Sequence, residues 1–119
     1  MRIPLDVIYR HCYGKYAIPA VNVFCMEQVL GLFHAAEQAA APFIVQLTPY
    51  ARDYAHPTML AGMITAAAKI HPKTVFSVHL DHGVESHCFD AIASTHYDSV
   101  MIDASHDPFE KNIERKIIF

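Results

Sequence analysis

The sequence predicts an α/β fold built on one parallel sheet. Short apolar runs alternate along the chain with longer segments in which apolar residues recur at helical spacing, and the connections between them are short. Successive parallel strands need a crossover between them, which such helices provide. The apolar runs are nearly continuous, as expected for strands that are covered on both faces.

The first third of the chain predicts a helix, a strand and a second helix. Pro4 to Tyr13 is expected to form a short opening helix that breaks near Gly14. The apolar run Ile18–Val23 predicts the first strand. Met26–Ala41 predicts a long helix, which Pro42 ends. The apolar face of this helix carries Val29, Phe33, Ala36 and Ala40.

The middle of the chain predicts a strand, a loop and a third helix. Phe43–Leu47 is an apolar run of strand length. The next segment contains Pro49, Tyr50 and Arg52, and we expect it to be a loop. Pro57–Ile70 predicts a long helix with its proline in the first turn, where a missing N–H costs nothing.

The last third of the chain repeats the same alternation. Thr74–Leu80 predicts the third strand and Val84–Ser94 a shorter helix. Ser99–Ile102 predicts the fourth strand, and Pro108 to about Ile118 the last helix. After the opening helix, the chain therefore provides about four strand–helix units.

Two folds fit this order, an open doubly wound sheet and a β/α barrel. Counting back in twos from Asp81 puts His79 and Ser77 on one strand face and leaves Leu80 and Val78 for the helices. The same count gives every strand a polar end on what would be one common face: Asn22, Thr48, Asp81 and Asp103. Because a barrel collects its chemistry at the carboxyl ends of its strands, this pattern favours the barrel. A doubly wound binding domain is also less favoured because the four glycines form no phosphate-binding fingerprint.

Composition excludes several classes of function. The formal net charge of −3 and the absence of a basic stripe argue against a nucleic-acid partner. No apolar run reaches membrane-spanning length, so no membrane association is expected. The start, Met1 to Asp6, lacks a signal-peptide apolar region, and a cytoplasmic protein is expected. The three cysteines form no CxxC motif and are expected to be reduced.

The most informative stretch is His79-Leu80-Asp81-His82-Gly83, which ends the third expected strand. A carboxylate between two imidazoles places a general acid/base beside a possible metal ligand. At the mouth of a barrel, such a pair could ionise a carbonyl substrate.

Segments along most of the chain resemble class II, metal-dependent aldolases of the fructose-bisphosphate and tagatose-bisphosphate type. His79–Gly83 resembles the first signature motif of that family. The other segments that resemble the family, in the same order, are Tyr16–Val23, Met26–Gln28, Ile44–Pro49, Ser99–His106 and Pro108–Asn112. The resemblance implies the N-terminal half of an eight-unit TIM barrel, with the short opening helix before it and one partial domain over residues 1–119.

The resemblance also implies roles for individual residues. Asp81 would be the catalytic acid/base, and His82 a ligand of a catalytic zinc ion that polarises the substrate ketone. Asp103 would lie at the metal site, serving a second monovalent or divalent cation. Thr48 and Asn22 would contact the substrate, a phosphorylated ketose that is cleaved to dihydroxyacetone phosphate and an aldehyde. The motifs do not distinguish fructose from tagatose bisphosphate.

The chain departs from the family in extent. Members use a full barrel of roughly 250 residues, whereas residues 1–119 supply about four units and lack the second, glutamate- and glycine-rich signature and the later zinc-binding histidines. A catalytic zinc site needs about three protein ligands, so the site is incomplete and the isolated chain is expected to be inactive. The alternative is a non-catalytic half-barrel that self-associates as a homo-oligomer or pairs with another chain through its unpaired strand edges.

Overall fold

A computed structural model describes residues 1–118, so Phe119, the last residue of the expected domain, lies outside the described residues. Four parallel strands form one sheet in the order β1-β2-β3-β4. The strands are β1 (Ala20–Asn22), β2 (Phe43–Leu47), β3 (Phe76–Gly83) and β4 (Ser99–Ile102). A doubly wound sheet reverses its strand order at a switch point. The sequential order seen here is that of a barrel, in which each strand is added beside the last.

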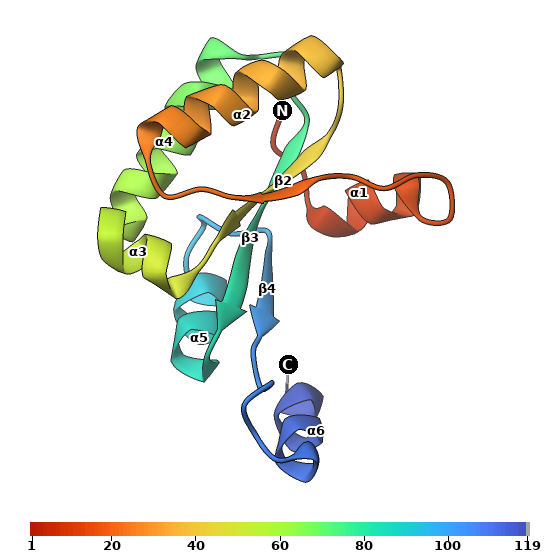
Figure 1. Ribbon diagram of the computed structural model, residues 1–119, viewed down its shortest axis with the longest axis vertical. Helices are drawn as coiled ribbons and strands as arrows, with labels where there is room; N and C mark the ends of the chain where they lie inside the picture. Colours follow the sequence, from red (N-terminus) through yellow and green to blue (C-terminus); the bar gives the residue numbers. More distant parts are fainter. Residues whose placement is uncertain (119) are drawn as a thin grey trace.

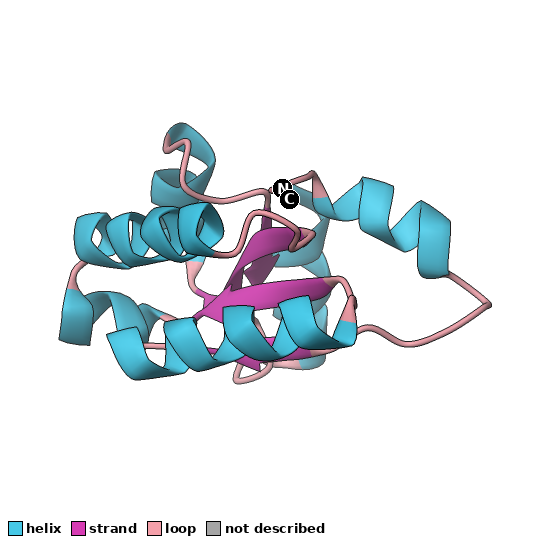
Figure 2. Ribbon diagram, turned by 90° about the horizontal axis from the view of Figure 1, so that it is seen from above, coloured by secondary structure: helices cyan, strands magenta, loops and turns pink. Residues whose placement is uncertain are grey.

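The helices cover the sheet unequally. They are α1 (Leu5–Cys12), α2 (Met26–Ala39), α3 (Pro49–Ala55), α4 (Pro57–Ile70), α5 (Glu85–Ala93) and α6 (Phe109–Ile118). In Figure 1, α3, α4 and α5 lie to the left of the strands, α2 crosses above them, α1 lies to the right, and α6 lies below the end of β4. The view from above shows the strands turned relative to one another (Figure 2), which is the twist of parallel sheets.

The main core lies between the sheet and the helices α2 and α4. Phe33 of α2 is fully buried, and its ring centroid lies 5.1 Å from that of Phe43 and 4.9 Å from that of Phe76, both edge to face. Such aromatic contacts add stability beyond the apolar area that they bury. A smaller cluster packs Leu5 and Ile8 of α1 against Ile44 on the opposite face of the sheet.

The alternation predicted for the third strand is confirmed. Phe76 and Val78 belong to the core under the helices, whereas Ser77 and Asp81 point to the other face. The strand itself is longer than expected at its carboxyl end, since β3 continues through Gly83 with an irregular register between Leu80 and Gly83. The first strand is shorter than expected, because only Ala20–Asn22 pairs with β2.

The expected loop after the second strand is wrong: Pro49–Ala55 forms the helix α3. The hydroxyl oxygen of Thr48 accepts a hydrogen bond from the N–H of Ala51 at 3.2 Å, which caps the helix, and Pro49 occupies the first turn. Within residues 1–118, no helix is long and apolar enough to cross a membrane.

Candidate active site

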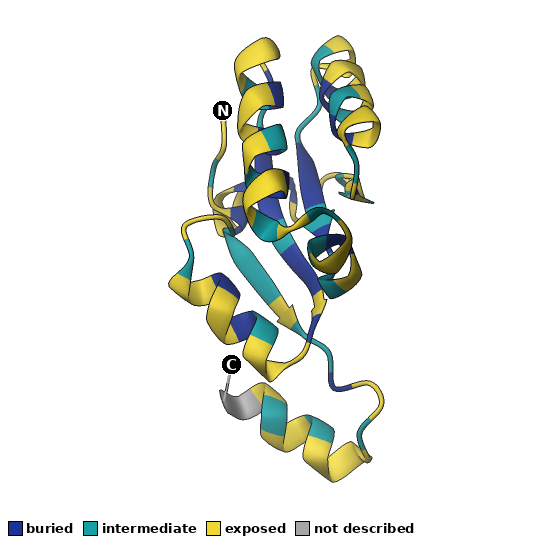
Figure 3. Cartoon of the chain, turned by 90° about the vertical axis from the view of Figure 1, so that its left-hand side faces the viewer, coloured by how far each residue is buried: buried dark blue, intermediate teal, exposed yellow. Residues whose placement is uncertain are grey.

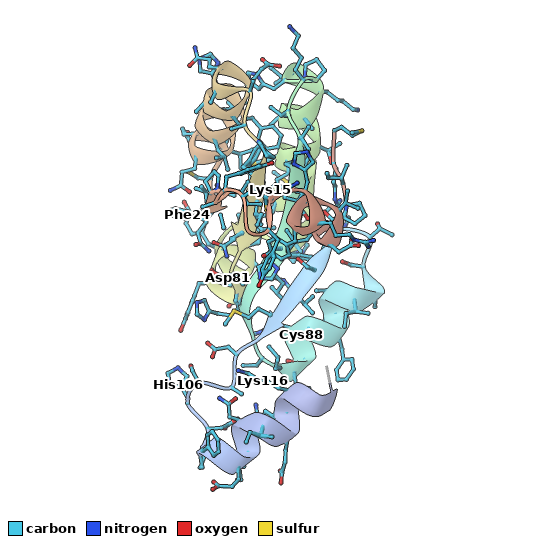
Figure 4. All side chains as sticks on the ribbon, turned by 90° about the vertical axis from the view of Figure 1, so that its right-hand side faces the viewer. Lys15, Phe24, Asp81, Cys88, His106 and Lys116 are labelled. Carbon is cyan, nitrogen blue, oxygen red and sulfur yellow. The ribbon has the colours of Figure 1, made fainter. Side chains whose placement is uncertain are left out.

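The carboxylate of Asp81 lies at the carboxyl end of β3, where the sequence places an acid/base. Its side chain is 10% exposed, and its Oδ2 accepts a hydrogen bond from the Nδ2 of Asn22 at 2.9 Å. Asn22 ends β1, two strands away, so this bond confirms that the two polar strand ends share one face. Asp81 lies near the middle of the molecule in Figure 4, whereas His106 lies toward α6.

The imidazole of His82 is held between two carboxylates. Its Nδ1–H donates to the Oδ2 of Asp103 at 2.8 Å, and its Nε2 lies 3.8 Å from the Oδ1 of Asp81. A carboxylate can only accept, so Nδ1 carries a proton, and in the neutral form of the ring the lone pair lies at Nε2. The His82 side chain is 57% exposed, which leaves Nε2 open to a ligand.

A local irregularity in β3 turns His82 toward Asp103. His82 has φ +55°, in the left-handed region that non-glycine residues rarely adopt, and the register with β4 shifts between Leu80 and Gly83. The N–H of Asp103 donates to the carbonyl of Gly83 at 2.8 Å, which ties the ends of the two strands together. The alternation of side chains between the two faces of β3 is therefore broken at His82. As a result, the side chains of Asp81 and His82 both lie at the same end of the sheet.

Gly83 is required by close packing. A Cβ atom at this position would lie 2.7 Å from Cδ2 of Leu80 and 3.0 Å from Sγ of Cys88. The thiol of Cys88 is buried at the start of α5 and is directed at the carbonyl of Gly83. The glycine of the motif therefore lets α5 approach the strand that carries Asp81 and His82.

These contacts shift the pKa values of Asp103 and His82. Hydrogen bonds from the side chain and backbone of Ser105, and then from His82, hold the pKa of the Asp103 carboxyl well below its usual range. The hydrogen bond to Asp103, followed by the negative charge of Asp81, raises the pKa of His82. The arrangement therefore favours an ionised Asp103 and a readily protonated His82.

His79 lies on the same strand face two residues before Asp81. Its Nδ1 is 2.7 Å from the hydroxyl oxygen of Ser99 on β4, and burial lowers the pKa of its ring. The contact between His79 and Ser99 therefore links β3 to β4 on the face of the sheet that carries Asp81.

Thr48 lies at the same level of the sheet as Asp81. Leu47 is aligned with Leu80 across β2 and β3, so Thr48 and Asp81 are the next residues on neighbouring strands. Its hydroxyl is used as the cap of α3, and no described contact joins it to Asp81.

Arg52 of α3 packs against α5, the helix that follows His79–Gly83. The sequence did not predict this contact. The Arg52 side chain is 13% exposed, lies 5.9 Å from the Tyr97 ring centroid and is 3.9 Å from the carboxylate of Asp90 on α5. An arginine beside a tyrosine and an aspartate far along the chain gives no local pattern, so only the fold brings them together.

The donor set fits one corner of a zinc site. The Nε2 lone pair of His82 is a suitable ligand, and the bond from Nδ1 to Asp103 is the support that metal-binding histidines usually have. No group of three histidine, cysteine, aspartate or glutamate residues suited to a metal ion is present among residues 1–118. A catalytic zinc ion needs about three protein ligands, so the described residues alone do not make up such a site.

Two cavities of the described chain lie away from this cluster. A cavity of about 460 Å³ lies between α1 and the end of α2, and another of about 310 Å³ lies beside α4. Neither cavity is lined by Asp81, His82 or Asp103. The cluster offers one imidazole nitrogen to a metal ion and a carboxylate at Asp81 that can accept or donate a proton.

Comparison with known families gives one consistent match. The family model described as class-II fructose-bisphosphate aldolase matches residues 5–116. The fructose-bisphosphate aldolase of Giardia intestinalis is 37% identical over 99 residues, which are 83% of this chain and 31% of that protein. Fructose-bisphosphate aldolase 2 of Cereibacter sphaeroides is 44% identical over 91 residues, which are 76% of this chain and 25% of that protein. The chain thus spans about a quarter to a third of these curated relatives.

Solved structures give the same fold over almost the whole chain. The YdjI aldolase from Escherichia coli K12 is 28% identical, with a TM-score of 0.80 over 96% of this chain and 43% of its own. Fructose-bisphosphate aldolase from Campylobacter jejuni superposes with a TM-score of 0.82 over 98% of this chain and 42% of its own, and at 21% identity supports the fold alone. The four strands therefore correspond to under half of a TIM-barrel protein.

Proposed function

The chain belongs to the class II fructose-bisphosphate aldolase family, and we propose that it supplies the catalytic acid/base and one metal ligand of an aldolase. The observation that carries the proposal is the cluster at the strand ends, in which Asn22 binds Asp81 and His82 lies between Asp81 and Asp103. The proposed reaction is reversible aldol cleavage of a phosphorylated ketose to dihydroxyacetone phosphate and an aldehyde. Fructose and tagatose bisphosphates both fit this proposal.

In the cleavage direction, Asp81 would take the proton from the hydroxyl next to the bond that breaks. The carbon–carbon bond then breaks, the new carbonyl leaves with the aldehyde, and the electron pair stays with the other half, which takes up a proton from water to become dihydroxyacetone phosphate. In the reverse direction, Asp81 returns the proton to the new hydroxyl. Asn22 holds Oδ2 of Asp81, which leaves Oδ1, 3.8 Å from the Nε2 of His82, to exchange the proton.

A zinc ion held by the Nε2 of His82 would supply Lewis-acid polarisation of the substrate ketone. Asp103 fixes the tautomer that leaves this nitrogen free, and we propose that its main role is to orient His82. Each Asp103 oxygen accepts one hydrogen bond, Oδ2 from His82 and Oδ1 from the Ser105 N–H, and each keeps a further lone pair with which Asp103 would bind a second cation.

Thr48 is proposed to contact the substrate from the end of β2, because it lies level with Asp81 on the neighbouring strand. A phosphorylated sugar is therefore the proposed small-molecule partner. The cytoplasmic location and the homo-oligomer expected from the sequence remain predictions.

The experiment joins this chain to the remaining strands of a relative. A chimera would carry residues 1–118 followed by the part of the Escherichia coli YdjI aldolase that this chain does not cover. Cleavage of ketose bisphosphates should appear in the folded chimera, disappear after exhaustive chelation and return with zinc. Cleavage that survives chelation, or a folded chimera that cleaves none of the ketose phosphates tested, would contradict the proposal.

A further inference from the structure

One peptide group in the connection between β4 and α6 is held on both of its sides. Its carbonyl, from Ala104, accepts a hydrogen bond from the Nδ2 of Asn112 on α6 at 2.7 Å and another from the N–H of Asp107 at 3.1 Å. Its N–H, from Ser105, donates to the Oδ1 of Asp103 at 3.0 Å. A trans peptide group is planar, and its C=O and N–H point in opposite directions. Asn112 and the Asp103 carboxylate therefore bind the two sides of one rigid unit.

This peptide group lies in a part of the connection that is shielded from water. Ala104 is 3% exposed, and Figure 3 shows a buried stretch in the connection that leads from β4 to α6. The side chain of Asp103 is 14% exposed, and Asn112 is half-buried. Hydrogen bonds that are shielded from water are stronger than exposed ones. The bond from Asn112 therefore fixes the direction of this peptide group more firmly than an exposed bond would.

The hydrogen bonds continue from this peptide group to the proposed metal ligand. The second oxygen of Asp103, Oδ2, accepts from the Nδ1–H of His82 at 2.8 Å. Because the Ser105 N–H holds Oδ1, it sets the rotation of the carboxylate that faces His82. The His82 side chain is 57% exposed, so packing alone does not fix the orientation of its ring. That orientation depends on the carboxylate, and the carboxylate depends on the peptide group.

We propose that Asn112 is a positioning residue for His82, which acts through the Ala104–Ser105 peptide group and the Asp103 carboxylate. The consequence for zinc rests on the proposed function, whereas the effect on the His82 ring does not. Partners at the second nitrogen of a metal-binding histidine fix its tautomer, and their loss commonly lowers metal affinity about 10–100-fold. This role also accounts for Asn112 in the Pro108–Asn112 segment, to which the proposed reaction assigns no part.

The first test measures the tautomer of His82 in the zinc-free chimera of the preceding section. Nitrogen NMR of the histidine rings at alkaline pH reports it, and the His82 signal is assigned by its loss in His82→Gln. The parent ring should carry its proton on Nδ1. Asn112→Asp keeps the shape but loses the donor when ionised, and Asn112→Ala removes the donor while favouring the helix. Both should move a measurable share of the protons to Nε2, and an unchanged share in both would overturn the proposal.

Two control variants separate this role from a general contribution of α6 to the fold. Lys111→Gln makes the same change in charge as Asn112→Asp at the preceding, exposed position. Arg115→Gln breaks another contact between α6 and the connection, in which the Nε of Arg115 lies 2.9 Å from the Oδ2 of Asp107. Neither variant should change the tautomer of His82. If Arg115→Gln moves it as far as Asn112→Asp does, the docking of α6 as a whole is responsible and the proposal is overturned.

Zinc affinity provides the second readout and distinguishes this proposal from the proposed function. The dissociation constant for Zn²⁺, measured by competition with a chelator, should rise about 10–100-fold in Asn112→Asp and stay nearly unchanged in Lys111→Gln. If the chimera cleaves no ketose phosphate but the His82 tautomer still responds to Asn112→Asp, the proposed function fails and the positioning role stands. If the chimera is active and neither the tautomer nor the zinc affinity changes, the positioning role fails and the proposed function stands.

Discussion

At the scale of single residues, the site depends on one histidine in an unusual backbone conformation. His82 adopts a left-handed φ and is bound by Asp103 and approached by Asp81. The residue type and its place at a strand end were predictable from the sequence. It could not give the bond to Asp103, because the two residues are far apart in the chain and the irregular register that aligns them has no sequence pattern of its own.

The raised pKa of His82 predicts a pH-dependent stability in the metal-free chain. A group whose pKa is higher in the folded state than in the unfolded state, where it is about 6.5, stabilises the fold fully below that value. The contribution is lost as the pH rises through the folded-state pKa. His82→Gln should therefore lower the free energy of unfolding in urea more at pH 5.5 than at pH 8.5. His106→Gln, at an exposed loop position, is the control. An equal loss at both pH values for His82→Gln would contradict the assignment.

Gly83 makes a prediction about packing. Gly83→Ala should destabilise the chain by about 1–3 kcal/mol, because the new methyl group overlaps Leu80 and Cys88. Gly62→Ala is the matched change in the interior of α4, where a Cβ meets nothing within 4 Å, and it should stabilise by about 1 kcal/mol. Thermal or urea unfolding of both variants measures the difference, and equal effects would show that Gly83 is not sterically constrained.

At the scale of elements, regular segments were predictable and the site's irregular ones were not. Pro57–Ile70 and Ser99–Ile102 have the expected bounds, since continuous apolar patterns define them. The helix α3 was missed because its proline and tyrosine suggested a loop, although Thr48 followed by Pro49 is also a helix-start signal. Strand alternation correctly predicted that Asn22 and Asp81 share a face. It could not predict that β3 continues through His82.

The cap of α3 can be tested separately from any substrate role of Thr48. Thr48→Ala should cost about 1 kcal/mol of stability, because the Ala51 N–H loses its acceptor. Thr48→Ser keeps a hydroxyl and should retain most of the stability. Equilibrium unfolding of the two variants checks this, and equal losses would show that the methyl group, rather than the cap, matters.

At the scale of the whole molecule, the chain corresponds to under half of a TIM-barrel protein, and its polar strand ends lie at one end of the sheet. The core between the sheet and α2 and α4 is formed within the chain, whereas the described residues provide His82 alone and not the further ligands of the proposed zinc site. The sequence indicated this division through the resemblance and the missing later motifs. The remaining strands of a barrel and the other zinc ligands are not among residues 1–119, so this sequence could not predict them.

The measurement that tests the central claim most directly is the turnover of the zinc-loaded chimera with Asp81→Asn. Asparagine keeps the shape of the side chain but cannot accept the substrate proton, so kcat should fall by about 10²–10⁴-fold while the fold is retained. Asp6→Asn, which removes an exposed carboxylate on α1 that pairs with Arg10, should leave kcat unchanged. An Asp81→Asn chimera that turns over ketose bisphosphate as fast as the parent would contradict the assignment of Asp81 as the acid/base.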